Sequence, residues 1–319
     1  MEAAEARLGD RGLALRPSGT KGGTRGVFTT RPMKRGTLVL ESLPIGTVIS
    51  PADRLNKCSY CFAPFRNLAD AKRCTGCRQA IYCGKECQAA DWRSGHRFVC
   101  NDDVLSSDVD VELLFRVSLI PLLAESDLPA GTLEAAAVFG TLEHHFDQLP
   151  AGMRHEYTRT AEAVREKLLS ATAKLGADPA LVASVADLAR DLGRFGCNNF
   201  EMYDDEVFSY GLGVFPHGAL LNHECRPNCV AVYVDSPGQP CVQQMRLTAD
   251  VPADTELTVT YLDAIATDES RREATQQKYF FDCRCARCTT DDWIDGILQA
   301  PLLKACDGYA PFRCIFYTN

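Results

Sequence analysis

Long hydrophobic runs are missing from this 319-residue sequence, and none approaches the roughly 20 apolar residues that a membrane-spanning helix needs. The N-terminal segment also lacks an apolar run and carries charges of both signs, so its pattern predicts neither a signal peptide nor a transit peptide. Positive charge is scarce, because 34 lysines and arginines face 42 aspartates and glutamates for a formal net charge of −8. This balance argues against general binding to nucleic acid or to an anionic membrane, and it favours a basic partner.

Cysteine, in contrast, is abundant. Sixteen cysteines without a secretory signal indicate a reducing compartment, the cytoplasm, the nucleus or both, where thiolates are free to bind metal. One short stretch holds eight possible zinc ligands, namely Cys58, Cys61, Cys74, Cys77, Cys83, Cys87, His96 and Cys100. Three Cys pairs and a closing His-x3-Cys provide four half-sites, and a tetrahedral structural zinc takes two of them. The stretch predicts a two-zinc module rather than a disulfide-stapled loop, and its spacing leaves sequential and interleaved pairing both open.

A second metal signal lies nearer the C-terminus, where the pattern Cys283-x-Cys285-x2-Cys288 supplies three ligands and lacks a fourth nearby. Cys225 is the leading candidate, because it stands in a tight polar loop between apolar segments. By spacing alone it competes with three other thiols, those of Cys229, Cys306 and Cys314.

The rest of the sequence changes its hydrophobic period along the chain. The period is helical from Val104 to Phe195, and prolines at the junctions divide this part into three or four expected helices. The polar sequence at 270–277 is compatible with a further helix. Strands are expected over 27–30, 37–40, 208–211, 229–234, 241–247 and 256–261. This order predicts a small β core that is interrupted by the zinc module and by a helical insertion.

The motifs of the chain, taken in order, resemble a SMYD-type protein, which is a SET-domain lysine methyltransferase split by a MYND zinc finger. The finger carries Tyr82 before Cys83 and Trp92 between Cys87 and His96, as in that family. The other matching motifs are Arg25-Gly26-Val27-Phe28, Cys197-Asn198-Asn199-Phe200, Gly211-Leu212-Gly213-Val214-Phe215-Pro216, Asn222-His223-x-Cys225-x-Pro227-Asn228-Cys229, Glu256-Leu257-Thr258-x-x-Tyr261 and Tyr279-x-Phe281-x-Cys283-x-Cys285-x2-Cys288.

The resemblance implies an α+β fold, mainly a β SET core with an inserted MYND zinc finger, a helical insertion and a Cys-rich post-SET zinc site. The implied parts are the N-terminal part of the SET domain at 12–57, the MYND finger at 58–100, the helical insertion at 101–196, the core SET domain at 197–264, the post-SET segment at 265–290 and a short C-terminal tail at 291–319. Many relatives continue into a helical C-terminal domain, so the tail is expected to be a truncated form of it.

For the metals, the resemblance implies interleaved pairing and three structural zinc ions. The implied ligand sets are Cys58, Cys61, Cys83 and Cys87 for one zinc, Cys74, Cys77, His96 and Cys100 for the second, and Cys225, Cys283, Cys285 and Cys288 for the third.

The activity that the resemblance implies is S-adenosylmethionine-dependent methylation of lysine side chains in protein substrates, histone or non-histone. Asparagine amides suit the cofactor because each offers a donor and an acceptor, and Phe281 would stack on adenine. A plainer interpretation is that these side chains hydrogen-bond a buried turn or pack in the core. The residues carried over as cofactor contacts are Arg25, Asn198, Asn222, His223, Tyr279 and Phe281.

Tyr261 is the candidate catalytic residue. Methyl transfer from a sulfonium is an in-line displacement that depends on alignment, and the lysine amine must arrive neutral although an unperturbed lysine is protonated at pH 7. A narrow apolar channel beside a cationic cofactor would lower the pKa of that amine. Phe200 and Tyr261 are the candidate channel walls, with Tyr279 as a further one, and a phenol hydroxyl there can orient the amine.

One departure from the family pattern favours an alternative function. Glu224 stands where the family usually has a small serine, which places a carboxylate beside the third zinc and the cofactor. The alternative is a catalytically weak scaffold that recruits protein partners through the finger, and the acidic chain disfavours a DNA-binding regulator. We expect a monomer that binds a protein or peptide presenting lysine, without a membrane, and with nucleic-acid contact at most weak.

Overall fold

The computed structural model describes residues 2–19, 24–106, 108–204, 208–263 and 266–289. The predicted tail at 291–319, with Cys306 and Cys314, lies outside these residues. The chain divides into two compact units. The first unit comprises Met1–Arg7, Leu38–Leu220 and Ala231–Met245, and the second comprises Leu8–Thr37, Leu221–Val230 and Arg246–Asn319. Helix α1 (Glu2–Asp10) and strands β10 (Cys229–Val234) and β11 (Val242–Leu247) each cross a boundary between the units.

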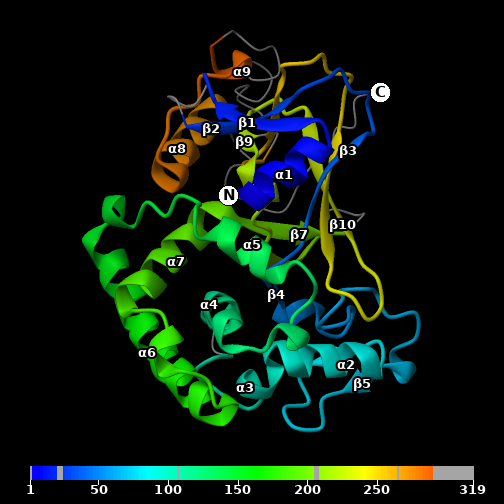
Figure 1. Cartoon of the computed structure of the whole chain (residues 1–319), viewed down its shortest axis with the longest axis vertical. Coiled ribbons are helices and arrows are strands. Elements are labelled where there is room, and N and C mark those ends of the chain that lie inside the picture. The colour runs from blue at the N-terminus through cyan, green and yellow to red at the C-terminus, as the bar shows by residue number, and fades with distance from the viewer. Residues whose placement is uncertain (1, 20–23, 107, 205–207, 264–265, 290–319) are drawn as a thin grey trace, which may run out of the picture. The chain divides into compact units, whose positions relative to one another are not determined.

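The second unit is built on a four-stranded sheet in the order β1-β2-β12-β9. Figure 1 labels three of these strands, β1, β2 and β9. Its strands are β1 (Leu13–Pro17), β2 (Arg25–Thr29), β12 (Glu256–Val259) and β9 (Asn222–His223). Strand β2 pairs antiparallel with β1 and β12, whereas β12 pairs parallel with β9. The parallel register sets Thr258 opposite Asn222 and Val259 opposite His223. The strands β9 and β12, which are distant in the sequence, therefore lie side by side.

Two helices complete the described part of the second unit, α8 (Asp268–Tyr279) and α9 (Ala286–Thr289). The side chain of Thr267 accepts a hydrogen bond from the backbone N–H of Ser270 and so caps the start of α8. Phe280 ends the helix with a left-handed φ of 58°, which turns the chain sharply into Phe281. The post-SET cysteines follow directly after this turn.

The first unit contains a three-stranded antiparallel sheet of β4 (Gly46–Ile49), β8 (Ser209–Val214) and β7 (Asn199–Tyr203). The backbones of β4 and β8 approach so closely that a Cβ added to Gly211 would lie only 2.6 Å from the carbonyl oxygen of Val48. Strand β3 (Leu38–Ser42) joins a separate sheet in the order β10-β11-β3. A buried core cluster of this unit consists of Ile49, Phe62, Met202, Tyr210, Phe215 and Cys241.

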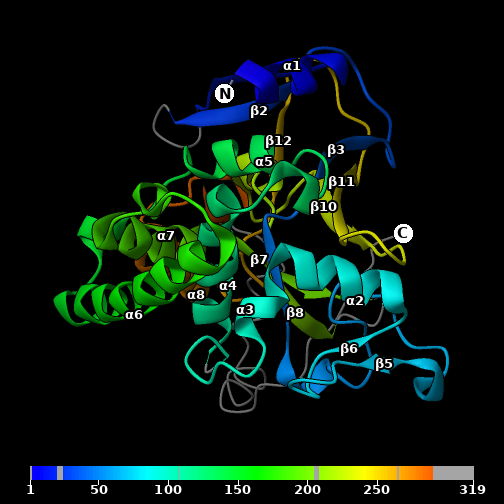
Figure 2. The ribbon, with the colours of Figure 1, turned by 60° about the horizontal axis from the view of Figure 1, so that its bottom comes forward.

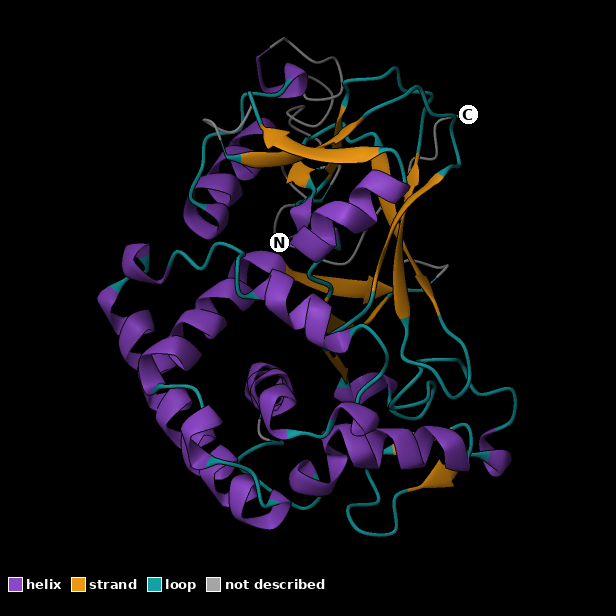
Figure 3. Cartoon of the chain, viewed as in Figure 1, coloured by secondary structure: helices purple, strands orange, loops and turns teal. Residues whose placement is uncertain are grey.

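The helical insertion and the finger make up the rest of the first unit. The described part of the insertion has four α-helices, α4 (Val109–Leu119), α5 (Thr132–Phe139), α6 (Ala151–Leu175) and α7 (Val185–Asn198), of which α4, α6 and α7 pack on one another. The finger consists mostly of loops (Figures 2 and 3). Its regular elements are β5 (Lys72–Arg73), β6 (Ile81–Tyr82), α2 (Lys85–Asp91), a π-helical turn at Trp92–His96 and α3 (Arg97–Val99).

The α+β class with a helical insertion is confirmed. Every predicted strand run overlaps a strand of the structure, but β1, β4, β5, β6, β7 and β9 were not predicted. Strand β9 has only two residues and is held by its neighbour β12, so propensity alone gives no signal for it. Within the described residues, no helix combines the length and the apolar composition needed to cross a membrane.

Candidate functional site

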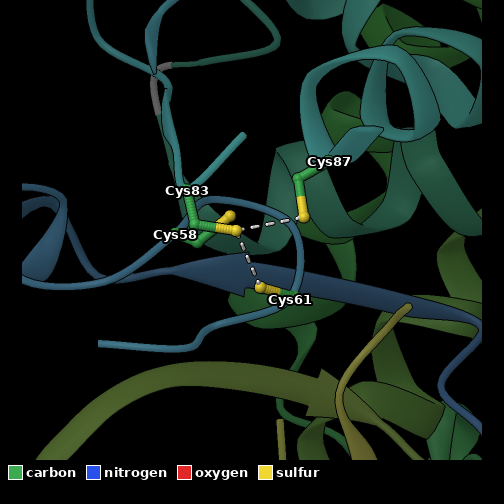
Figure 4. Close-up of side chains that lie close together, drawn as sticks. All are labelled: Cys58, Cys61, Cys83 and Cys87. Carbon is green, nitrogen blue, oxygen red and sulfur yellow. Dashed lines mark hydrogen bonds between the residues drawn. The ribbon is translucent and has the colours of Figure 1, made fainter. Parts of the chain in front are cut away.

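Two groups of zinc-type ligands lie in the finger. The first finger group consists of Cys58, Cys61, Cys83 and Cys87, and the second finger group consists of Cys74, Cys77, His96 and Cys100. The ligand atoms within each group all lie within 4.8 Å of one another. Figure 4 shows the side chains of the first finger group with their sulfur atoms turned toward one another. The grouping is interleaved, as the family resemblance implied, and sequential pairing is excluded.

The sulfur spacings in both finger groups fit tetrahedral zinc. The Sγ atoms of Cys61 and Cys83 are 3.7 Å apart, as are those of Cys74 and Cys100. A zinc–sulfur bond of about 2.3 Å gives a tetrahedral edge of about 3.8 Å. A disulfide would require about 2.05 Å, and the fourteen cysteines in the described part of the chain are all free thiols. Each finger group can therefore hold one zinc ion.

A buried carboxylate supports the second finger group. Asp91 is 2% exposed, and its Oδ2 lies 3.9 Å from His96 Nδ1 and accepts a hydrogen bond of 2.8 Å from the hydroxyl of Tyr82. Its Oδ1 forms an ion pair of 2.8 Å with Arg116 Nη1 on α4. Burial lowers the pKa of His96, although Asp91 opposes the shift. A neutral imidazole is the form that binds metal, and a carboxylate beside it orients the ring.

The first finger group has a support from far along the chain. The backbone N–H of Gly238, in the turn between β10 and β11, donates to Cys87 Sγ at 3.1 Å. Gly238 adopts a φ of +83°, a backbone conformation that residues other than glycine rarely adopt. An N–H bond to a thiolate sulfur stabilises its negative charge. Both finger groups therefore depend on segments outside the finger as well as on their own ligands.

The third cysteine group consists of Cys225, Cys283, Cys285 and Cys288, all of them buried. The Sγ atom of Cys225 lies 3.9 Å from that of Cys283 and 3.5 Å from that of Cys288, again close to a tetrahedral edge. Cys229, a competitor by spacing, lies outside the group, and burial raises its pKa to about 12. The structure thus selects Cys225 as the fourth member.

His223 connects the third cysteine group to the end of β12. Its Nδ1 accepts a hydrogen bond of 3.0 Å from the backbone N–H of Tyr261, and its Nε2 lies 3.3 Å from Cys225 Sγ. The ring is 3% exposed. It also lies 5.3 Å from the Tyr261 ring and 6.0 Å from the Phe281 ring, measured between centroids. His223 is therefore a central contact of this part of the second unit.

Hydrogen bonds hold both the side-chain hydroxyl and the backbone carbonyl of Tyr261. Its hydroxyl donates to the carbonyl oxygen of Leu221 at 2.8 Å, and its own carbonyl oxygen accepts from the hydroxyl of Tyr279 at 3.1 Å. The rings of Tyr261 and Tyr279 lie 5.0 Å apart. The structure thus brings Tyr261, Tyr279, Phe281 and His223 into one aromatic cluster beside the third cysteine group.

The remaining residues implied by the resemblance divide between the units. Asn222 lies in the second unit and donates to the backbone carbonyl oxygen of Arg25 at 2.8 Å. Asn198 and Phe200 belong to the first unit. The amide of Asn198 donates to the carbonyl oxygens of Glu143 and Arg194, and the ring of Phe200 packs edge-on against Phe215 at 6.2 Å.

Glu224 lines a small pocket in the second unit. The pocket has a volume of about 80 Å³ and is lined by His223, Glu224, Glu256, Thr258, Cys283, Arg284 and Cys285. Glu224 Oε2 accepts a hydrogen bond of 3.2 Å from the hydroxyl of Thr258, and burial raises the pKa of its carboxyl. Sequence reasoning flagged Glu224 but missed Glu256 and Thr258. The sequence signal for both residues was the motif Glu256-Leu257-Thr258-x-x-Tyr261, from which only Tyr261 was predicted as a site residue.

Comparison with known proteins gives matches at two levels. The family model of the MYND finger matches residues 58–100. The N-lysine methyltransferase SMYD2 of Bos taurus is 28% identical over 289 residues, which cover 89% of this chain and 62% of that protein. The histone-lysine N-methyltransferase ASHR1 of Arabidopsis thaliana is 26% identical over 315 residues, which cover 96% of this chain and 60% of that protein. The chain therefore spans about three fifths of the length of the curated relatives it matches.

A solved structure of the SET domain of LSMT bound to lysine and AdoHcy aligns with 88% of this chain and 58% of that chain, at a TM-score of 0.42 and 11% identity. A TM-score of that size carries no weight for this chain.

Together, the interleaved finger, the parallel β9–β12 pair and the third cysteine group agree with the arrangement that the family resemblance implied, and the finger is a MYND finger. The family match shows a MYND finger at 58–100, and the relatives show that most of the chain is similar in sequence to SMYD2 and ASHR1.

Proposed function

We propose that this protein is an S-adenosylmethionine-dependent protein-lysine N-methyltransferase with three structural zinc ions. The observation that carries the proposal is the cluster around His223, in which the loop after β9 and the end of β12 bring Tyr261, Tyr279 and Phe281 beside the third cysteine group. The names of the relatives, N-lysine and histone-lysine methyltransferases, support the same activity.

The proposed cofactor contacts are Arg25, Asn222, His223, Tyr279 and Phe281, all in the second unit. A contact from Asn198 stays a prediction. When bound, S-adenosylmethionine supplies a methyl group on a sulfonium whose S–C bond breaks with its electrons remaining on sulfur. Phe281 offers a ring for adenine, and it lies 6.0 Å from the His223 ring, measured between centroids. Asn222 offers an amide oxygen to a donor group of the cofactor.

Tyr261 is the proposed catalytic residue, and its role is to orient the substrate amine. Its hydroxyl hydrogen is committed to the carbonyl oxygen of Leu221, which leaves the phenol oxygen as an acceptor for an N–H of the amine. The amine lone pair then points along the transfer direction and forms the new N–C bond. Tyr261 keeps its proton throughout, and most of the acceleration comes from alignment.

The proposed substrate is a lysine in a protein or peptide, and Tyr261 is a proposed wall of its channel. The role of Phe200 as a second wall stays a prediction. The finger is proposed to bind a protein partner. A monomer located in the cytoplasm, the nucleus or both stays a prediction.

The test is transfer of a radiolabelled methyl group from S-adenosylmethionine by the zinc-loaded protein to histones and to a cell extract. The expected result is label recovered as methyl-lysine after acid hydrolysis of the acceptor proteins. If the protein binds S-adenosylmethionine but transfers no label to either acceptor, the scaffold function replaces this proposal.

A further inference from the structure

Glu256, at the start of β12, joins three segments of the second unit. Its Oε1 accepts a hydrogen bond of 2.8 Å from Asn222 Nδ2 on β9, and its Oε2 accepts one of 2.9 Å from the hydroxyl of Ser18, just after β1. Its backbone carbonyl oxygen accepts from the amide of Asn228 at 2.8 Å. Both carboxylate oxygens are therefore used to hold other polar side chains.

These contacts determine how the amide of Asn222 is turned. Asn222 Nδ2 donates to Glu256 Oε1 and to the carbonyl oxygen of Arg25, both at 2.8 Å. A peptide carbonyl and an ionised carboxylate can only accept, so the atom that faces both must be the NH2 group. The reverse orientation would bring the amide oxygen against two other oxygens. Asn222 Oδ1 consequently faces away from β2 and β12.

The backbone beside this contact has no room for a larger residue. A Cβ added to Gly26 on β2 would lie 2.3 Å from Glu256 Oε1 and 3.2 Å from Asn222 Nδ2. The nearest atom is the end of a flexible side chain, so an alanine at this position would displace the carboxylate of Glu256 from Asn222. The glycine therefore leaves the space in which Glu256 reaches the amide.

We infer that Glu256 is a positioning residue of the cofactor site, an inference that rests on the proposed function. By holding both amide hydrogens together with the Arg25 carbonyl, Glu256 presents Asn222 Oδ1 as a fixed acceptor. The group of S-adenosylmethionine that Asn222 meets is then a hydrogen-bond donor, an ammonium or a hydroxyl, and not the carboxylate. Glu256 acts through Asn222 and does not itself touch the cofactor.

The experiment measures S-adenosylmethionine affinity by calorimetry on the zinc-loaded full chain. Glu256→Ala is expected to weaken binding about tenfold, the loss typical of one charge-assisted hydrogen bond. Asn222→Ala should weaken it by a similar factor. The double variant should bind no more weakly than Asn222→Ala alone, because both changes remove the same interaction.

Two further variants separate positioning from a general structural role. Glu256→Gln should stay within about threefold of the unaltered chain, since its amide oxygen can accept from Asn222 while its NH2 donates to the Ser18 hydroxyl. Glu273→Ala, which removes an exposed carboxylate on α8 of the same unit, is the matched control and should leave affinity unchanged.

Unchanged affinity in Glu256→Ala, or multiplied losses in the double variant, would overturn the inference while leaving the proposed function in place. If the unaltered zinc-loaded chain does not bind S-adenosylmethionine, the proposed function fails and the inference fails with it. Should Glu256→Ala not fold, Gly26→Ala provides the same comparison, with a tenfold loss expected and unchanged affinity contradicting it.

Discussion

The two finger groups and the third cysteine group have similar ligands, but the chain assembles them differently. The finger ligands all fall within residues 58–100. In the third group, Cys225 meets Cys283 and Cys288, which follow it by 58 and 63 residues. A zinc in the third group would therefore join the loop after β9 to the segment that carries Tyr279 and Phe281. The difference teaches that zinc in the finger groups would join ligands within one short segment, although Gly238 and Arg116 support that segment from outside, whereas zinc in the third group would join remote segments of the proposed cofactor site.

The largest effect is expected when one cysteine ligand is removed from the third cysteine group and, in a separate variant, one from the second finger group. Cys225→Ala should lower the zinc content from about three ions per chain to about two and abolish S-adenosylmethionine binding, because structural zinc contributes about 10 kcal/mol or more to folding its site. Cys74→Ala should also remove one zinc but retain cofactor binding, since the second finger group contains none of the proposed cofactor contacts. Elemental analysis and calorimetry measure the two effects.

Equal loss of cofactor binding in both variants would show that the finger and the cofactor site depend on each other, contrary to this comparison. Full cofactor affinity in Cys225→Ala would show that the third group does not shape the site.

A smaller effect is expected where the finger meets the helical insertion. Asp91→Asn should destabilise the chain by about 2 kcal/mol, because it removes the charge that pairs with Arg116 and weakens the bond from Tyr82. Arg116 would keep only Glu112, at 2.8 Å, as its carboxylate partner. Urea unfolding measures the change in free energy.

The matched control is Asp70→Asn, an exposed aspartate of the same finger, which should change stability by less than about 0.5 kcal/mol. Equal effects of the two substitutions would mean that the finger folds without help from α4.

The smallest of the three effects concerns Tyr261 in the second unit. Tyr261→Phe should lower the methyl-transfer rate by about tenfold while cofactor affinity holds, because the missing hydroxyl acts in alignment and the ring packing is kept. Single-turnover kinetics and calorimetry separate the two quantities. Tyr279→Phe, which removes the bond to the Tyr261 carbonyl, should lower the rate by less. A parallel fall in affinity and rate for Tyr261→Phe would make Tyr261 a structural wall.

Features that depend on residues close together in the sequence were the most predictable. The spacing of the finger cysteines identified eight ligands, and the family resemblance implied the interleaved grouping that the structure has. The helical period of the insertion predicted three or four helices, and the described residues contain four. In both cases the geometry depends on neighbours a few residues away, which a pattern records directly.

The residues around Asn222 were less predictable. The sequence offered four possible partners for the Cys283 to Cys288 pattern, and only the pairing of β9 with β12 brings Cys225 to it. The hydrogen bonds that turn the amide of Asn222 come from Glu256 and Arg25, which lie 34 and 197 residues away. No local pattern records such contacts.

The sequence by itself determined the possible metal ligands and the MYND finger, and it supplied the aromatic residues of the proposed site. The tertiary structure decided which thiol completes the third group, that Glu224 lines a pocket, and which way Asn222 presents its amide. The physical reason is that side-chain types are fixed by the chain, whereas the distances between remote side chains depend on strand pairing and packing.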